Sequence, residues 1–105
     1  MNYHKYKECI DACLNCAALC HHCASEDLRE DHDMKQCIQL NMECAVICTA
    51  AAQLMSLGSV QALSLCKLCA EICRKCAGEC GKYVYKHCLE CEEACHKCAE
   101  LCSKM

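Results

Sequence analysis

The sequence contains no proline, no tryptophan and no phenylalanine, and only three of its 105 residues are glycine. Proline and glycine are the residues that disfavour a helix most strongly, so their scarcity favours long helices with few breaks. The length is enough for one domain and hardly for two, so we expect a single domain over residues 1–105.

Other missing features argue against whole classes of function. The net charge is only −3 with both signs dispersed, and no basic patch indicates a nucleic-acid partner. No apolar run approaches the 18 or so residues of a membrane-spanning helix. The N-terminal residues MNYHKYKECIDAC contain no apolar signal segment, so we expect a cytoplasmic location and no membrane partner. No Ser/His/Asp arrangement, glycine-rich phosphate loop or pair of carboxylates indicates an enzyme.

What the chain does have is cysteine, which accounts for 18 of its 105 residues. A content above about 10% already marks disulfide-rich or metal-binding proteins. In a reducing cytosol, cysteine at this density usually indicates metal binding.

The cysteines recur at a helical spacing. Residues 13–23, 66–76 and 88–98 read CLNCAALCHHC, CKLCAEICRKC and CLECEEACHKC. Steps of 3 and 4 average 3.5 residues, the spacing of the inward stripe of a packed helix. We therefore predict helices over about 3–25, 33–57, 60–80 and 84–103. Their short connections favour an all-α, antiparallel up-down-up-down four-helix bundle with a cysteine-lined core.

Local signals mark the ends of these helices. Asp33 followed by Gln36 predicts a capping box at the start of the second helix. Gly58 suits the end of that helix, and Ser59 the N-cap of the third. The second helix is apolar nearly all round its circumference, which predicts burial on every side. In a lone bundle one side would face water, so we expect this helix to contact another subunit.

Thiols are small, so a core lined by them leaves gaps that something else must fill. The ligand form is the negative thiolate, and no Lys or Arg lies on a predicted stripe to neutralise it. Zinc in Cys₄ sites leaves two negative charges per ion, whereas one copper(I) per thiolate approaches neutrality and suits soft sulfur ligands. The predicted metal ligands are Cys9, Cys13, Cys16, Cys20, Cys23, Cys37, Cys44, Cys48, Cys66, Cys69, Cys73, Cys76, Cys80, Cys88, Cys91, Cys95, Cys98 and Cys102.

Four stretches carry a family resemblance: CIDACLNCAALCHHC, CIQLNMECAVIC, LCAEICRKCAGEC and HCLECEEACHKCAELC. The chain resembles the cytosolic branch of the four-helix-bundle copper storage proteins. This resemblance implies a tetramer that stores many copper(I) ions on cysteines inside the bundle, without catalysis. Two positions depart from the pattern: Asp27 stands where the helix-one spacing would place another cysteine, and the loop before the fourth helix carries only His87.

An antiparallel bundle would bring most of the histidines to one end. We expect copper to enter there, and the residues that could serve this route are His22, Met34 and His87. Other functions stay open at this point: a zinc or iron–sulfur protein, a disulfide scaffold, and a copper chaperone that holds about one ion. The number of ions bound separates the chaperone from a store.

Overall fold

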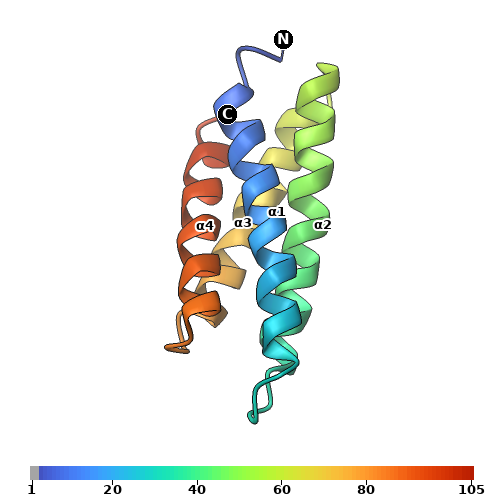
Figure 1. Ribbon diagram of the computed structural model, residues 1–105. Helices are drawn as coiled ribbons and strands as arrows, with labels where there is room; N and C mark the ends of the chain where they lie inside the picture. The colour runs from blue at the N-terminus through green and yellow to red at the C-terminus, as the bar shows by residue number, and fades with distance from the viewer. Residues whose placement is uncertain (1–2) are drawn as a thin grey trace.

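The computed structural model describes residues 3–105, which form four α-helices and no strand. These are α1 (Lys7–Asp27), α2 (Lys35–Leu57), α3 (Ala62–Cys80) and α4 (Lys86–Ser103). The predicted all-α four-helix bundle is confirmed, and Figure 1 shows successive helices running in opposite directions.

Each helix packs against two neighbours, in the cyclic order α1, α2, α3, α4 and back to α1. The result is a rod measuring 46 × 18 × 17 Å. The start of α1 and the end of α4 lie at one end of the rod, together with the α2–α3 connection, and the α1–α2 and α3–α4 loops lie at the other (Figure 1). We call the latter the loop end.

The predicted capping box at Asp33 is wrong. Helix α2 begins at Lys35 with Met34 as its N-cap, and no side chain caps it. Asp33 lies one residue too early, so its carboxylate accepts a hydrogen bond only from the backbone N–H of Lys35, at 3.0 Å.

The connection between α2 and α3 uses the predicted glycine. Gly58 adopts φ 67° and ψ 31°, a left-handed conformation that a residue with a Cβ adopts only with strain. The N–H of Ser59 then bonds to the carbonyl of Leu54 at 3.0 Å. Ser59 is not the N-cap of α3, since that residue is Gln61; its hydroxyl nevertheless accepts a hydrogen bond from the Gln61 N–H at 3.0 Å.

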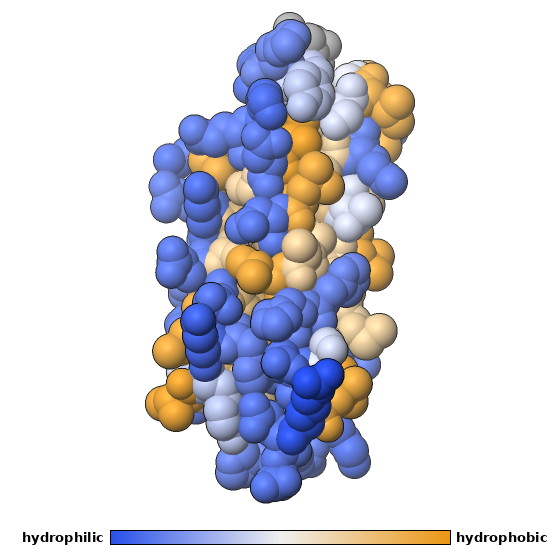
Figure 2. Space-filling view, in the orientation of Figure 1, coloured by the Kyte–Doolittle hydropathy of each residue, from blue (hydrophilic) through white to orange (hydrophobic). Residues whose placement is uncertain are grey.

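Helix α2 has a buried face and an exposed apolar face. Val46 and Leu57 are 70% and 79% exposed in the single chain. Figure 2 shows hydrophobic side chains gathered along the upper part of α1 and α2. By length and composition alone α2 could cross a membrane, and 44% of its most apolar window is buried in the bundle.

Candidate metal centre

All 18 cysteines are buried, and all are free thiols. Cys9 and Cys102 are 4% and 1% exposed, and the other sixteen have no exposed surface. The 3-and-4 spacing therefore turns every cysteine toward the core, as the sequence predicts. Alanines such as Ala51, Ala62 and Ala77 fill most of the remaining core positions.

The middle of the core contains sulfur from all four helices. The Sγ atom of Cys44 lies 3.5 Å from that of Cys73, 3.8 Å from Cys48 and 3.9 Å from Cys16 and Cys95. Cys48 also lies 3.7 Å from Cys73. A single ion in this region would have several thiols within reach at once.

These contacts continue along the axis. Toward the chain ends, Cys48 contacts Cys98 at 3.8 Å, Cys98 contacts Cys13 at 3.6 Å, and Cys13 contacts Cys102 at 3.6 Å. Toward the loop end, Cys20 lies 3.7 Å from Cys91. The thiols named here thus form one column from Cys102 to Cys91, with each sulfur within 4 Å of the next.

Groups of four buried cysteines recur along this column, with their sulfur atoms within 4.8 Å of one another. Five such groups are Cys13/Cys69/Cys98/Cys102, Cys16/Cys20/Cys44/Cys95, Cys16/Cys44/Cys48/Cys73, Cys20/Cys76/Cys91/Cys95 and Cys48/Cys69/Cys73/Cys98. Several thiols belong to two groups. Shared ligands suit bridged clusters better than separate mononuclear sites.

Neighbouring thiols change one another's acidity. The hydrogen bond between Cys16 and Cys20, whose sulfurs are 3.9 Å apart, lowers the pKa of Cys16 and raises the pKa of Cys20. Burial raises the pKa of Cys88, because no solvent stabilises its thiolate. Among residues 3–105 the buried charged or polar side chains are Asp27, Asn41 and Glu79, so no lysine or arginine there neutralises the core.

Asn41 places an amide inside the sulfur column. Its Oδ1 accepts hydrogen bonds from Cys76 at 3.1 Å, from Cys91 at 3.2 Å and from Cys80 at 3.6 Å. Its Nδ2 donates to the sulfur of Cys37 at 3.6 Å. Asn41 lies on the inward side of α2, and its amide joins thiols from three helices.

Asp27 ends the column at the loop end. Its side chain is fully buried, and burial raises its pKa. Asp27 Oδ1 lies 3.0 Å from His87 Nε2 and accepts a hydrogen bond from the Cys88 thiol at 3.6 Å. Asp27 therefore occupies the inward position that the cysteine pattern reserves, but with oxygen in place of sulfur.

The residues predicted for the copper route lie in different environments. His87 is 11% exposed and adjoins the column through Asp27. Met34 is 3% exposed and lines a pocket of about 390 Å³ together with Asp27 and His32. His22 is exposed on α1 and does not line the pocket that Asp27 and Met34 line.

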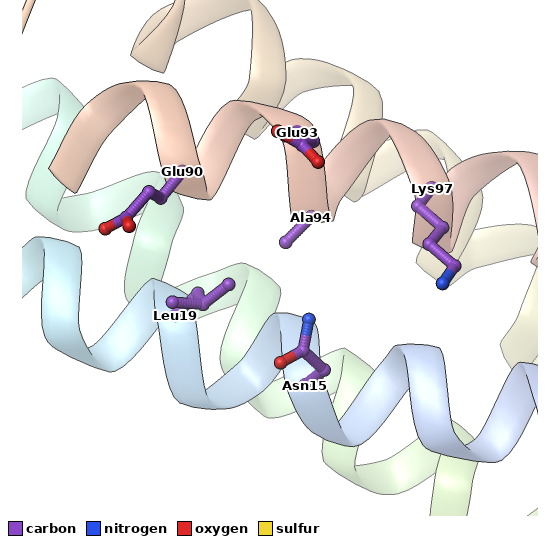
Figure 3. Close-up of a pocket in the computed structure, with 6 residues that line it drawn as sticks. All are labelled: Asn15, Leu19, Glu90, Glu93, Ala94 and Lys97. Atoms are coloured by element: carbon purple, nitrogen blue, oxygen red, sulfur yellow. The ribbon is translucent and has the colours of Figure 1, made fainter. Parts of the chain in front are cut away.

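A groove of about 320 Å³ lies between α1 and α4, away from the core. Figure 3 shows Asn15 and Leu19 facing Ala94 across it, with the charged side chains of Glu90 and Lys97 on either side. It contains no cysteine, so soft-metal chemistry belongs to the core and not to this groove.

Comparison with known proteins identifies the class. The copper storage protein family matches residues 2–105, and the chain belongs to this family. This agrees with a bundle whose interior is lined by thiols.

Three solved structures illustrate the relationship. Apo-Csp3, copper storage protein 3 from Bacillus subtilis, is 42% identical, with a TM-score of 0.92 over 94% of this chain and 96% of that one. The Cu(I)-bound copper storage protein BsCsp3 is 41% identical, with a TM-score of 0.91 over 95% and 96% of the two chains. A cytosolic copper storage protein from Streptomyces lividans, solved with five coppers, is 35% identical, with a TM-score of 0.87 over 91% and 87%.

Proposed function

We propose that this chain stores copper(I), holding many ions per chain on thiolates inside a single four-helix-bundle domain. The observation that carries this proposal is the uninterrupted run of buried sulfur, in which each Sγ lies within 4 Å of another from Cys13 to Cys91. The proposed ligands are the 18 cysteines given above. The copper-containing relatives support the same assignment.

Charge and ligand type favour copper(I) over zinc for the column. A buried thiolate without a neighbouring cation is costly, and each copper(I) brings one positive charge to offset one thiolate. Copper(I) also prefers soft sulfur donors, and the middle of the column offers no others. An iron–sulfur cluster usually takes its cysteines from a loop, whereas these cysteines lie on four helices.

The same features argue against catalysis. The ligand groups are buried, and neither of the pockets described above is lined by a cysteine. A cytosolic store, such as the cytosolic relative from Streptomyces lividans, must bind many copper ions and release them slowly. We infer that the chain is a binding protein and not an enzyme.

Copper enters at the loop end in this proposal. The pocket lined by Asp27 and Met34 opens to solvent there, and the nearly buried His87 links the surface to the first thiols. His22, being exposed, serves at most to attract the ion. Replacing His87 with alanine should slow copper loading without lowering capacity, whereas His96→Ala on the outer face of α4 should change neither. Unchanged loading kinetics in His87→Ala would contradict this route.

The exposed apolar face of α1 and α2 serves as the contact between copies of the chain, giving the tetramer that the resemblance implies. Leu14 and Leu57 line a pocket of about 490 Å³ on this face, and Val46 is an exposed apolar residue of the same helix as Leu57. Val46→Glu should reduce the mass found by analytical ultracentrifugation. Leu89→Glu on α4, where Leu89 is 48% exposed, is the matched control and should not.

The storage function is tested by an anaerobic copper(I) titration of the fully reduced protein against a colorimetric chelator. Tight uptake approaching one copper per cysteine is the expected result. Saturation near one ion per chain would indicate a chaperone. Failure to compete, with zinc or iron in the purified protein, would overturn the proposal.

A further inference from the structure

The groove between α1 and α4 continues beyond the hollow shown in Figure 3. A second hollow, of about 300 Å³, extends it toward the start of α1. The residues that line both hollows are Asn15, Ala94 and Lys97. Together the two hollows form one groove, which follows α1 from position 8 to position 19, or about 16 Å at the helical rise of about 1.5 Å per residue.

Carboxylates line both ends of this groove. Glu8 and Asp11, which we call the α1 pair, lie at the end near the start of α1. Glu90 and Glu93, the α4 pair, lie at the other end. Lys97 is the only basic residue among those that line the two hollows. The lining therefore carries four negative charges and one positive charge at neutral pH.

The two acidic pairs are too far apart for one small cation to bridge. Helices α1 and α4 run in opposite directions (Figure 1), and Cys20 of α1 contacts Cys91 of α4 at 3.7 Å. The α4 pair therefore lies level with α1 residues near position 20. The α1 pair is about ten residues away along that helix, which corresponds to about 15 Å. A ligand that meets both pairs must be elongated, and about three turns of a helix span this distance.

Three of the four carboxylates are not neutralised by the chain itself. Asp11 Oδ2 lies 3.0 Å from Lys7 Nζ. The side chains of Glu8, Glu90 and Glu93 make no hydrogen bond or ion pair within residues 3–105. By contrast, lysines one helical turn away neutralise carboxylates near the ends of α3 and α4. The groove therefore keeps its negative charge available to a partner.

Small side chains allow a partner to approach closely. Ala12 and Ala94 are buried residues that line the groove, and the partly buried Leu19 adds apolar surface. Figure 3 shows the amine of Lys97 directed toward α1 and away from the carboxylate of Glu93. Lys97 therefore leaves the α4 pair open to an incoming positive charge.

We propose that the groove between α1 and α4 docks a lysine- or arginine-rich helix of a partner protein, whose basic side chains meet the two acidic pairs. Complementary charge of this kind favours fast association that weakens as salt is added. The groove contains no thiol, so the proposal does not rest on copper storage.

The probe for this groove is a fluorescently labelled, alanine-based helical peptide with two pairs of lysines on one face, about eleven residues apart to match the two acidic pairs. Its control is an isomer with the same lysines spread around the helix, so that only two can face the groove. Fluorescence anisotropy should show the one-faced peptide binding about 2- to 30-fold more tightly, the range expected for two further exposed ion pairs. Equal affinity for both peptides would indicate nonspecific attraction and overturn the proposal.

Charge reversal locates the bound peptide. Glu90→Lys/Glu93→Lys should weaken binding at least about 10-fold, because two attractions become two repulsions. Glu43→Lys/Glu71→Lys is the matched control, since it changes the net charge equally on α2 and α3, which do not line the groove. The control should weaken binding less than about 3-fold at physiological salt, where charges more than about 8 Å apart are largely screened.

Reversing the α1 pair in the same way should weaken binding to a similar degree, so the test does not depend on one variant remaining folded by circular dichroism. Equal losses in the groove variants and in the control would overturn the proposal. Analytical ultracentrifugation of the same proteins tests a second copy of the chain as the occupant. A lower mass in Glu90→Lys/Glu93→Lys, but not in the control, would assign the groove to that copy and also overturn the proposal.

Discussion

The middle of the bundle and its loop end differ in the donor atoms that they bury. Around Cys44 every close donor is sulfur, with Sγ atoms of three other helices 3.5–3.9 Å away. At the loop end, a carboxylate, an amide and an imidazole interrupt the sulfur. The same fold therefore buries only sulfur donors in its middle and a mixture of sulfur, oxygen and nitrogen donors at its loop end. The type of residue at each inward position determines this difference.

The largest expected effect comes from removing sulfur where it is most shared. Cys44→Ser/Cys73→Ser should lower the copper capacity more than Cys23→Ser/Cys88→Ser, because Cys44 lies within 4 Å of four other thiols and would bridge more ions. Serine keeps the size but supplies a poor ligand for copper(I). Chelator competition measures the copper capacity of both double variants. Equal losses would mean that the thiols in the middle of the bundle and those at the loop end contribute equally to the capacity.

A second prediction concerns pH. The hydrogen bond to Cys16 raises the pKa of Cys20, and burial raises the pKa of Cys88. Above the ordinary thiol pKa of about 8.5, the unfolded state therefore loses these two protons while the folded state keeps them. The stability of the metal-free protein should therefore fall as pH rises through that value, by about 1.4 kcal/mol per pH unit for each such thiol.

Urea unfolding between pH 7 and pH 10, under reducing and anaerobic conditions, measures this slope. The copper-loaded protein is the control, because its thiolates have already lost their protons and its stability should change little over the same range. A flat profile for the metal-free protein would show that the buried thiols keep an ordinary pKa.

A smaller effect is expected at the boundary between the two regions. Asn41→Leu keeps a similar volume but removes the donor to Asp27 Oδ2 and the acceptor for the Cys76 and Cys91 thiols. Losing one partner of a buried carboxylate should cost about 1–3 kcal/mol in the metal-free protein. Met55→Leu, an apolar exchange at another fully buried position of α2, is the control and should cost less than about 1.5 kcal/mol.

The smallest expected effect comes from adding a thiol at the loop end, which would extend the sulfur column by one residue. Asp27→Cys restores the residue that the spacing of α1 predicts, and should add about one copper ion to the capacity. If the copper capacity is unchanged, the column ends before this position for a reason other than the identity of residue 27.

The sequence predicts the core of this protein well because the information is local. The alternation of 3 and 4 in CKLCAEICRKC is enough to define an inward stripe, and Gly58 marks the end of α2 by its own conformational freedom. The prediction of a capping box at Asp33 failed because a cap requires the exact first residue of the helix, and sequence signals locate a helix end only to within one or two residues.

The loop-end cluster could not be predicted in the same way. Asp27 and His87 are separated by 60 positions, and only the packing of α1 against α4 brings them within hydrogen-bond distance. The sequence marks Asp27 as a missing cysteine, but this signal does not show that its side chain lies 3.3 Å from the amide of Asn41. That contact depends on how α1 and α2 pack side by side.

The absence of a buried lysine or arginine among residues 3–105 has a consequence for the particle as a whole. If one copper(I) replaces one thiol proton, the formal net charge of −3 at pH 7 is the same in the empty and the full protein. Filling then requires no counter-ions and leaves electrophoretic mobility and surface repulsion between particles unchanged. The net charge of such a store would be the same at any level of filling, so its solubility would not depend on how much metal it carries.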